Sequence, residues 1–572
     1  MELVDKVART IKPMLPKQLV VKLKKIAYGK PIASGQDKWM KYMQKLIKRD
    51  VAPYIPDNIT KNPDLALFWA PQVAAPHIYI QFLLGLAMQL RGWRVLFAVC
   101  DQPLPHCPYE LARHPRPTCD KCRQATVNMM KQFKLPYIRL SDYVSTEEIA
   151  RVHSEIMRTA HMDLLELREN SYEVGRISNE LLKYYYFGEV EFNATTFDVF
   201  TRILQGNLLI YRFAERLLLD YDPKVVVTNN GQMFHTRAGY TCFTSHGIRT
   251  ITWDGYPPFE DSFIFSQVEP SVLGYVDKAI WAAEKVNPLT HEQEYNVNNF
   301  LAGWRKGTIG DINYHPTPET SADGLRQRLH IADHKKTFLA FTNVIWDSSC
   351  LDRDVGFNGM MEWVYALIDW FVRNEADSQL VVRVHPAEKK LPEWAHTVFG
   401  VEQCIRQKYE TLPDNIVIVG PEDDAYSYTL AKIADAVGVY TTSLGYELAV
   451  QGRKVWVAGE VYYREHGFTL DVANRQHMYE LLEKTWDRDL TPSEQELAVK
   501  FTYLRFFRQI IRIPFLHRTK IEYLTRPYFK DLKFLWPQRD PMFGTLVDRV
   551  IDGKPFLDIP AETTAEWTDV PI

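Results

Sequence analysis

The sequence has no run of the ~18 consecutive apolar residues that a membrane-spanning helix needs. Its first 30 residues contain no continuous apolar core and no cleavage site, so they lack the pattern of a secretory signal. Internal repeats and low-complexity segments are absent as well. From these absences we expect a globular protein of the cytoplasm.

The chain carries little net charge, −3 over 572 residues, but the charge is unevenly distributed. Residues 1–50 hold 13 Lys and Arg against 4 Asp and Glu, and residues 500–540 hold 10 against 3. Two basic ends therefore flank an acidic middle. The length exceeds what one hydrophobic core supports, and 46% hydrophobic with 24% charged residues is ordinary for a globular protein. We expect two large domains with additional segments.

The three-glycine dinucleotide fingerprint is missing, although the pattern of strands and helices is that of an α/β protein. LALFWA (65–70) and VLFAV (95–99) are apolar strands separated by a helix, which indicates a βαβ unit. A second series of alternating strands and helices begins near residue 336. The sequence therefore predicts a GT-B-like fold class: two Rossmann-like domains facing an interdomain cleft, with extra helices at both termini.

The predicted segments are a basic helical extension (1–60), a first Rossmann-like domain (61–275) with a helical insertion (144–220), a linker (276–335), a second Rossmann-like domain (336–485) and a basic aromatic helical tail (486–572). Open α/β sheets bind ligands beyond the carboxyl ends of their strands. We expect the functional site between the two domains.

Three loops follow predicted strands of the second domain: TNVIWDSS (342–349), HPAE (385–388) and TTSLGYE (441–447). Because the carboxyl ends of parallel strands meet at one edge of a sheet, these loops should face the same crevice.

The TTSLGYE loop combines features of a phosphate site. Thr441, Thr442 and Ser443 offer hydroxyls, and Gly445 permits close backbone approach. A helix beginning here would direct N–H groups at a phosphate, with Glu447 one turn further in. A capped helix after a buried strand is the competing interpretation.

The stretch RVHPAE ends a β-branched run in a His-Pro pair. Pro386 lacks the N–H that a central strand needs, and it holds His385 extended. Arg383 alternates onto the same side of the strand. Beside the hydroxyl loop, His385 could donate a hydrogen bond to a leaving phosphate or protonate it, because its pKa lies near working pH. A structural histidine is the alternative.

RVHPAE followed by YTTSLGYELAVQGRKVWVAGEVYYREHGFTLD resembles the capsule polysaccharide biosynthesis family, which includes the Kdo (3-deoxy-manno-octulosonate) transferases of bacterial capsule assembly. More loosely, it is similar to GT-B sialyltransferases with His-Pro and Ser/Thr-Ser motifs. The resemblance is best over residues 336–485 and weaker over 61–275. It implies a GT-B glycosyltransferase that uses a nucleotide-activated sugar, with a CMP-linked, Kdo-like donor as one option.

The resemblance also implies roles for individual residues. In such enzymes the His-Pro histidine and a Ser/Thr pair contact the donor phosphate, which carries over to His385, Thr442 and Ser443. No catalytic metal is expected, because histidine, hydroxyls and a helix N-terminus neutralise the leaving group. We assign Arg383, Pro386, Thr441, Gly445 and Glu447 to the same donor site.

Glycosyl transfer needs a carboxylate at the reacting carbon, which GT-B enzymes take from the first domain. TITWDGYPPFED places Asp254 just beyond a strand, so Asp254 is the first choice and Glu260 and Asp261 are reserves. A simple turn residue is the alternative for Asp254.

Other polar residues are candidates for lining the cleft. They are Asn229, Asn230, His235 and Arg237 in TNNGQMFHTR, and His77 in the first Pro-containing loop. Helix capping is the competing explanation for the two asparagines.

Four of the seven cysteines lie close together, at Cys100, Cys107, Cys119 and Cys122. A disulfide is disfavoured in the cytoplasm, and a Cys-x2-Cys pair with two upstream cysteines suits a structural tetrahedral zinc. His106 or His114 could replace a cysteine. Free thiols, a redox pair and an iron–sulfur cluster remain alternatives.

The segment FTYLRFFRQIIRIPFLHRTKIEYLTRPYFKDLKFLWP (501–537) interleaves basic and aromatic residues. Contact with an anionic membrane surface, nucleic-acid binding and a terminal helix packing back across the cleft are three interpretations. We favour a peripheral position on the inner face of the membrane and expect no nucleic-acid partner.

The predicted function is transfer of a sugar from a nucleotide-sugar donor to a growing surface or capsular polysaccharide, or to a glycolipid or lipid-linked glycan acceptor. A polyol-phosphate transferase, a nucleotide-sugar epimerase of GT-B-like fold and a non-catalytic membrane-associated assembly protein remain alternatives.

Overall fold

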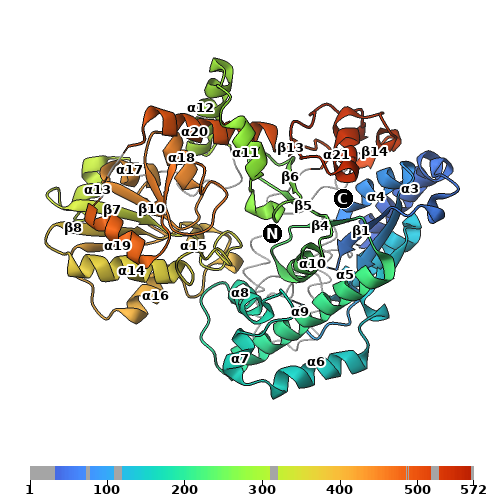
Figure 1. Ribbon diagram of the computed structural model, residues 1–572, viewed down its shortest axis with the longest axis horizontal. Coiled ribbons are helices and arrows are strands. Elements are labelled where there is room, and N and C mark those ends of the chain that lie inside the picture. The colour runs from blue at the N-terminus through green and yellow to red at the C-terminus, as the bar shows by residue number, and fades with distance from the viewer. Residues whose placement is uncertain are drawn as a thin grey trace, which may run out of the picture.

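The computed structural model describes residues 33–71, 78–107, 119–309, 320–484, 486, 489–516 and 527–568. Two α/β lobes stand side by side, each built on a mainly parallel sheet with helices on both faces (Figure 1). The predicted α/β class with two Rossmann-like domains is confirmed.

The first sheet has seven strands. They lie in the order β13 (Ile511–Arg512), β6 (Ser262–Ser266), β5 (Thr250–Gly255), β4 (Val225–Asn229), β1 (Leu65–Ala70), β2 (Arg94–Val99) and β3 (Tyr137–Arg139). From β3 to β5 the strands are parallel and follow the Rossmann order. At the far edge β6 pairs antiparallel with β5, and β13 pairs antiparallel with β6. Phe68 packs in one core, and its neighbours Leu67 and Trp69 pack in the core on the opposite face. A strand buried on both faces is apolar throughout, which explains the LALFWA run.

The second sheet has six strands. They lie in the order β12 (Thr469–Asp471), β11 (Val455–Val457), β10 (Ala436–Val439), β7 (Lys336–Phe341), β8 (Ser378–Arg383) and β9 (Ile416–Val419). All are parallel, and the direction in which the chain moves across the sheet reverses between β7 and β10. Rossmann-like sheets bind ligands at this switch point, beyond the strand ends. The predicted site loops follow β7, β8 and β10.

Helices cover both sheets. The helices that pack in the first domain are α3 (Ala33–Asp50), α4 (Ile78–Leu90), α5 (Cys119–Phe133), α10 (Phe234–Ser245) and α21 (Pro541–Asp552). The helices that pack in the second domain are α11 (Lys278–Glu284), α12 (His291–Arg305), α13 (Ala322–Arg328), α14 (Met360–Arg373), α15 (Ala387–Lys390), α16 (Val401–Lys408), α17 (Ser427–Ile433), α18 (Leu444–Val450), α19 (Arg475–Lys484) and α20 (Pro492–Tyr503).

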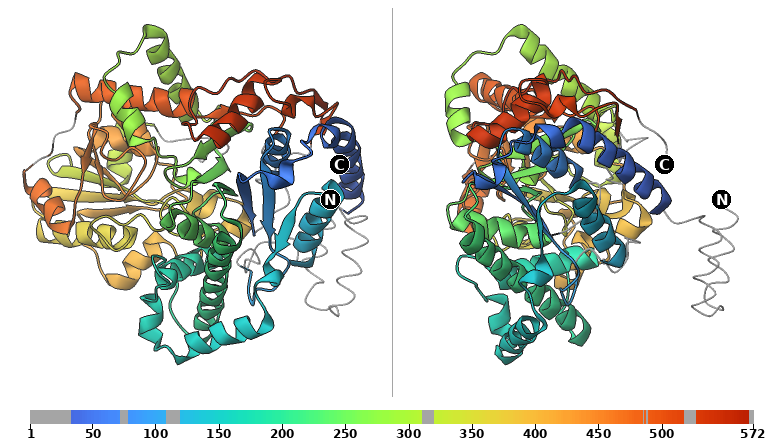
Figure 2. Two further views of the ribbon diagram at one scale, coloured as in Figure 1. Left: turned by 45° about the vertical axis from the view of Figure 1, so that its right-hand side comes forward. Right: turned by 90° about the vertical axis from the view of Figure 1, so that its right-hand side faces the viewer.

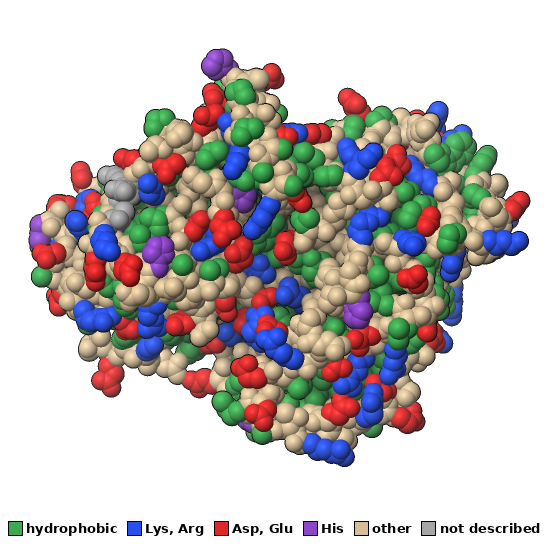
Figure 3. Space-filling view, viewed as in Figure 1, with side chains coloured by type: hydrophobic (Ala, Val, Ile, Leu, Met, Phe, Trp, Pro, Cys, Tyr) green, Lys and Arg blue, Asp and Glu red, His purple; other side chains and the backbone are tan. Residues whose placement is uncertain are grey.

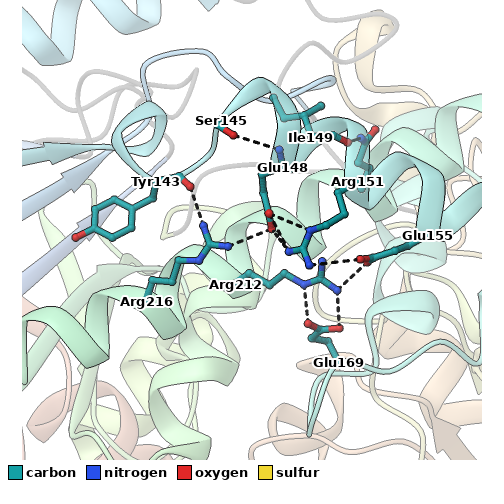
Figure 4. A network of polar contacts seen from close by, with 10 residues as sticks. Tyr143, Ser145, Glu148, Ile149, Arg151, Glu155, Glu169, Arg212 and Arg216 are labelled. Carbon is teal, nitrogen blue, oxygen red and sulfur yellow. Dashed lines mark hydrogen bonds and ion pairs between the residues drawn. The ribbon is translucent and has the colours of Figure 1, made fainter.

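A helical insertion separates β3 from β4. It consists of α6 (Thr146–Arg158), α7 (His161–Leu165), α8 (Val174–Tyr186) and α9 (Ala194–Tyr221). Arg212 of α9 donates to Glu169 (2.7 Å) and to Glu155 (3.0 Å), and Arg216 lies 3.3 Å from Glu148 (Figure 4). These pairs are partly exposed, so they orient the helices more than they add to the free energy of folding.

The insertion also contacts the second domain. Phe187, directly after α8, packs in a core of that domain, and its carbonyl accepts the amide of Val398 (2.7 Å). Gly188 forms an isolated β-bridge with Phe399, and a Cβ at Gly188 would lie 2.7 Å from the Phe399 amide nitrogen. Glycine is required here because the two backbones touch.

Near its C-terminal end the chain crosses back to the first domain. α20 continues into a π-helical turn (Leu504–Arg508), which leads to β13 at the edge of the first sheet. The C-terminal segment then runs beside α3 (Figure 2), where Trp39 donates to the carbonyl of Pro527 (3.1 Å). In the described part of the tail, the basic aromatic segment therefore packs back across the molecule.

The predicted N-terminal extension and the predicted linker both contribute helices to the cores of the two domains. α3, in the predicted N-terminal extension, buries Trp39 and Met43 in the core of the first domain. The helices of the predicted linker 276–335 bury Val297 and Leu325 against the second domain. An amphipathic helix buries its apolar face on the nearest sheet, and composition alone does not indicate which sheet that is. Within the described residues, none of the helices is both long and apolar enough to span a bilayer.

Candidate functional site

The loops after β7, β8 and β10 meet in one polar cluster. Thr342 and Asn343, which follow β7, connect the other two loops. The Thr342 hydroxyl oxygen accepts the amide of His385 (3.2 Å), and the Asn343 side-chain oxygen accepts the amide of Thr441 (3.1 Å). The Thr441 hydroxyl donates to the carbonyl of Ser349 (2.5 Å). The cluster lies at the switch point of the second sheet.

His385 is half-buried at the tip of β8. Its Nδ1 accepts the amide N–H of Ala387 (3.1 Å). A neutral imidazole carries one N–H, so this contact assigns the proton to Nε2. Pro386 begins the turn into α15 with helical backbone angles, φ −57° and ψ −32°. Nε2 is therefore the ring atom that can donate a hydrogen bond to an anion.

The hydroxyls of Thr442 and Ser443 lie at the start of α18 and are partly exposed. Thr442 Oγ1 accepts the amide of Leu444 (3.3 Å), and Ser443 donates to Glu447 (3.1 Å). The helix has only seven residues, and Thr442 already satisfies one of its first amides. The side-chain hydroxyls are therefore better suited to a ligand than the helix end is.

The structure gives Gly445 a different role from close approach to a ligand. A Cβ at this position would lie 2.2 Å from the hydroxyl oxygen of Tyr463. That hydroxyl donates to the carbonyl of Thr442 (2.5 Å). Glycine is required because Tyr463 packs against the first turn of the helix.

Two charged residues assigned to the donor site are turned into the protein. Arg383 is 1% exposed and donates to the carbonyls of Gly420 and Asp423, and burial lowers its pKa to about 10. Glu447 is 2% exposed and accepts the hydroxyl of Tyr428, and burial raises its pKa. Both residues stabilise the loops around the cluster instead of lining it.

In the first domain, Asp254 is partly exposed near the carboxyl end of β5. Its Oδ2 accepts the side-chain amide of Asn230 (2.7 Å). Asn230 has φ +61°, which asparagine tolerates better than most residues, and its Oδ1 accepts the amides of Gln232 and Met233. Asn230 therefore caps the turn into α10 and also orients the Asp254 carboxylate.

The other polar residues of this region are mostly engaged within the protein. Asn229 donates to the carbonyl of Trp253 (3.1 Å). His235 is 2% exposed, and burial lowers its pKa to about 4, so it is neutral at physiological pH. Arg237 forms an ion pair with Asp352 of the second domain (2.6 Å).

The reserve carboxylates differ in exposure. Asp261 is buried and forms a bidentate ion pair with Arg512 at distances of 2.7 and 2.9 Å, whereas Glu260 is exposed. Asp261 therefore holds β13 on the sheet.

The zinc prediction finds no support. Cys100 and Cys107 are reduced and partly buried, and the side chains of Cys119 and Cys122 lie outside the described residues, as do His77 and His114. Among the residues that the structure describes, no group of three or more His, Cys, Asp or Glu could hold a metal ion.

A pocket of about 60 Å³ lies between the two domains, next to the strand-tip cluster. Its lining is Tyr256, Leu273 and Tyr275 from the end of the first domain, and Ser349, Arg353, Thr441, Glu460, Val461 and Tyr462 from the second. The Tyr275 hydroxyl donates to the Glu460 carboxylate across the pocket (2.9 Å).

Sequence reasoning missed several of these residues. The TNVIWDSS loop was expected at the crevice, but Thr342 and Asn343 were not singled out within it, although they are a polar pair directly after a buried central strand. Arg353 had no local signal, because the pocket exists only once the domains pack, whereas Glu460 opens the polar and aromatic loop that follows β11 and so lies beyond a strand end. Glu180 of α8 is half-buried near Asp352 and Asp354 of the second domain, where desolvation raises its pKa.

Fold and site together define a two-domain α/β protein of the Rossmann-like class, with a polar cluster at the switch point of its second sheet. Residues 288–508 match the model of the family described as "Capsule polysaccharide biosynthesis protein". The family resemblance is confirmed over this part of the chain, which includes the His-Pro and TTSLGYE loops. The comparison with curated proteins gave no match.

Several solved structures are distantly similar. The β-Kdo 2,4-transferase of KpsC from Thermosulfurimonas dismutans is 14% identical, with 48% of this chain and 79% of that chain covered and a TM-score of 0.29. The β-Kdo 2,7-transferase of the same protein is also 14% identical, with 54% of this chain and 83% of that chain covered and a TM-score of 0.30. A UDP-GlcNAc 2-epimerase from Neisseria meningitidis is 10% identical, with 77% of this chain and 95% of that chain covered and a TM-score of 0.24.

Proposed function

We propose that the chain is a GT-B glycosyltransferase that transfers a sugar from a nucleotide-activated donor to a surface or capsular polysaccharide. The family match over residues 288–508 supports this proposal. The observation that carries it is the hydrogen-bonded cluster of Thr342, Asn343, His385 and Thr441. The cluster occupies the position at which Rossmann-like sheets bind nucleotides.

In the proposed reaction the donor phosphate leaves beside His385, Thr442 and Ser443. As the bond between the anomeric carbon and the phosphate oxygen breaks, its electron pair goes to that oxygen. The Nε2–H of His385 and the Thr442 hydroxyl donate hydrogen bonds to the developing charge, and the Ser443 hydroxyl does so by exchanging its hydrogen bond to Glu447 for one to the phosphate. The expectation of metal-independent catalysis rests on this set of donors.

The acceptor hydroxyl attacks the anomeric carbon and must lose its proton. Asp254 is the proposed base, because it is partly exposed at a strand end of the first domain and Asn230 orients its carboxylate. Glu180 is the second choice, because its carboxylate lies between the domains and its raised pKa favours proton uptake.

The finer assignments rest on the family resemblance. They are a CMP-linked, Kdo-like donor, a glycan or lipid-linked glycan as acceptor, and a peripheral position on the inner face of the membrane.

A nucleotide-binding screen tests the donor class. CMP, UDP, GDP and CDP are added to the full chain, and the unfolding temperature is measured. A nucleotide present at 100 times its Kd should stabilise the protein by about 2.7 kcal/mol. Failure of all four to bind would contradict the proposal and favour a non-catalytic assembly protein.

The His385→Ala variant tests the catalytic role. With the cognate donor we expect transfer to fall by about 10²- to 10⁴-fold, because the leaving phosphate loses a proton or hydrogen-bond donor. His477→Ala is the matched control, since the Nδ1 of His477 also accepts a backbone amide (3.1 Å), but it lies after the edge strand β12 and not after the central strands β7, β8 and β10. Equal turnover by the two variants would remove His385 from the mechanism.

A further inference from the structure

The outer face of α3 carries a row of lysines. Lys38, Lys41, Lys45 and Lys48 are exposed, and their spacing of three and four residues places them on one side of the helix. The opposite side of α3 packs in the core of the first domain. From Lys38 to the end of the helix the only acidic residue is Asp50, which is buried. Over this length the helix therefore presents positive charge alone to the solvent.

The charges of this row are not neutralised within the described part of the protein. None of the four lysines forms an ion pair with another described residue. The carboxylates that act on this helix, Asp50 and Asp531, lie beside Arg49 at its C-terminal end. Like charges three and four residues apart repel one another along a helix. An anionic partner would relieve that repulsion.

The end of α5 extends the row. Gln44, on the outer face of α3, donates to the carbonyl of Gln132 (3.1 Å), so the last turn of α5 lies beside α3. The lysines at that turn are exposed and form no ion pair with a described residue either. α3 lies at the end of the molecule that faces the viewer in the right-hand view of Figure 2. We call this surface the lysine face; it consists of Lys38, Lys41, Lys45, Lys48, Lys131 and Lys134.

The composition of the lysine face favours a lipid surface over a nucleic acid. Arginine matches single phosphates with its fork and stacks on bases, whereas lysine is a point charge on a flexible stem. The one arginine nearby, Arg49, donates from Nε and Nη2 to Asp50 (2.6 and 2.7 Å). Trp39 and Tyr42 of α3 hydrogen-bond to the C-terminal segment, so they offer no platform for bases. Four to eight basic residues on one helix are typical of contact with anionic lipid headgroups.

The structure also limits how such a contact forms. Amphipathic helices on membranes usually bury their apolar face among the lipids. The apolar face of α3 is not available for this, because Trp39 and Met43 are 2% and 0% exposed in the core of the first domain. Phe529 and Phe534 of the basic aromatic C-terminal segment are buried in the same core. Only the lysine side chains are left to meet the headgroups.

We propose that the lysine face docks the protein on an anionic lipid surface through charge alone, without insertion into the bilayer. The inference rests on the proposed function, because it gives a surface to the peripheral position named there. It assigns the contact to α3 and the end of α5, and not to the C-terminal segment from which the sequence led us to expect it.

Vesicle flotation of the full chain tests the docking surface. Phosphatidylcholine vesicles that contain phosphatidylglycerol supply the anionic surface, and vesicles of phosphatidylcholine alone are the neutral control. We expect binding to the anionic vesicles only. Binding should disappear at about 1 M salt, where the Debye length is about 3 Å. An inserted helix would stay bound at that salt concentration.

Charge variants identify the residues responsible. The Lys41→Gln/Lys45→Gln protein should partition onto anionic vesicles about 25-fold more weakly, from the usual contribution of a lysine near anionic headgroups. Lys41→Arg/Lys45→Arg keeps the charge and should bind like the wild type. Lys306→Gln/Lys484→Gln is the matched control, because it removes the same charge from two exposed lysines of the second domain that also form no ion pair with a described residue. It should bind like the wild type. Circular dichroism checks the fold of each variant.

Three results would overturn the docking surface: no binding of the wild type to anionic vesicles, equal weakening by the two glutamine pairs, or binding that persists at high salt. Binding to duplex DNA without binding to vesicles would assign the lysine face to nucleic acid and would also overturn it. The nucleotide screen is separate. Nucleotide binding without vesicle binding removes only this surface, whereas vesicle binding without nucleotide binding leaves the surface and removes the proposed transferase.

Discussion

Glu388, three residues after His385, takes the place of a capping side chain at α16. Its Oε1 accepts the amide of Val401 (3.3 Å). Gly400 has no side chain of its own, and a Cβ there would lie 2.1 Å from Oε2 of Glu388. Glu388 is 2% exposed, and burial raises its pKa to about 7, although the hydrogen bond from Val401 opposes the shift.

This carboxyl should make stability depend on pH. The folded-state pKa lies above the unfolded value of 4.5, so the contribution of Glu388 is fully present below pH 4.5 and is lost as the pH rises through about 7. The loss amounts to at most about 3 kcal/mol. In Glu388→Gln we expect a free energy of unfolding like that of the wild type near pH 4.5 and a higher one at pH 8. Urea unfolding at both values measures it, and an identical pH slope in the two proteins would contradict the assignment.

At the residue scale, local pattern predicted positions better than orientations. His385 was predictable because a His-Pro pair ending a β-branched run is a local feature of the chain. The partners of Arg383 were not, because its guanidinium reaches carbonyls that follow β9, about forty residues later in the sequence. Gly445 was recognised as a candidate, but the reason why glycine is needed there, the hydroxyl of Tyr463, lies beyond the next strand in the sequence.

At the element scale, the two domains are joined by an ion-pair clamp. Asp352, in the loop after β7, accepts from Arg176 of α8 (2.5 Å) and from Arg237 of α10 (2.6 Å). Burial alone would raise the pKa of the Asp352 carboxyl, but Arg237 and Arg176 outweigh it and the pKa lies below its usual range. Together with the Gly188–Phe399 bridge, the clamp holds the insertion against the second domain.

A double-mutant cycle tests the clamp. Asp352 has φ +59°, which asparagine tolerates, so Asp352→Asn removes the charge with little backbone strain. We expect a loss of about 1–3 kcal/mol, because Arg237, whose side chain is 19% exposed, loses its counterion, whereas Arg176 keeps its ion pair with Glu173 (2.6 Å). Arg237→Gln should cost less in the Asp352→Asn background than in the wild type. Additive effects in urea unfolding would show that the pair is not coupled.

Helices and strands were predictable where the pattern of one short segment is enough to identify them. The unbroken apolar run of β1 and the helical period of α14 identify these elements without reference to the rest of the chain. The clamp and the β-bridge were not predictable, because they join segments more than one hundred residues apart.

At the scale of the whole molecule, several basic side chains in the described part of the C-terminal segment form ion pairs. Arg508 pairs with Asp558 (2.7 Å), and Lys530 pairs with Glu566 (2.9 Å). On the face shown in Figure 3, basic and acidic side chains are interspersed without a continuous basic patch. Net charge therefore gave little information about the surface, because charge counts along the chain do not show which charges are paired.

The same segment completes the core of the first domain. Phe515, Phe529, Phe534 and Phe543 are buried with residues of α3, α4 and β1. Sequence order suggested a separate tail, because pattern reasoning assigns each segment to its neighbours in the chain. The chain passes from α20 of the second domain back to the first domain, and the long-range contacts that it makes there are not encoded in any local hydrophobic period.

This return predicts that the last helix stabilises the first domain. Phe543 of α21 is fully buried, with Phe515 and Phe534 as ring neighbours at 6.1 and 5.6 Å. In Phe543→Ala we expect a loss of about 3–5 kcal/mol. Because that core also contains residues of β1 and β4, hydrogen exchange should accelerate in peptides covering these strands and stay slow in those covering β7 and β8.

Phe507→Ala is the matched control for this experiment, since Phe507 is 40% exposed on the π-helical turn that precedes the crossing. It should cost far less, because its ring leaves no comparable cavity. If Phe543→Ala instead leaves exchange in β1 and β4 unchanged, the C-terminal segment is an appendage and the first domain is stable without it. If β7 and β8 accelerate equally, the two lobes unfold as one cooperative unit, and the interdomain clamp, rather than the shared core, controls the stability of the molecule.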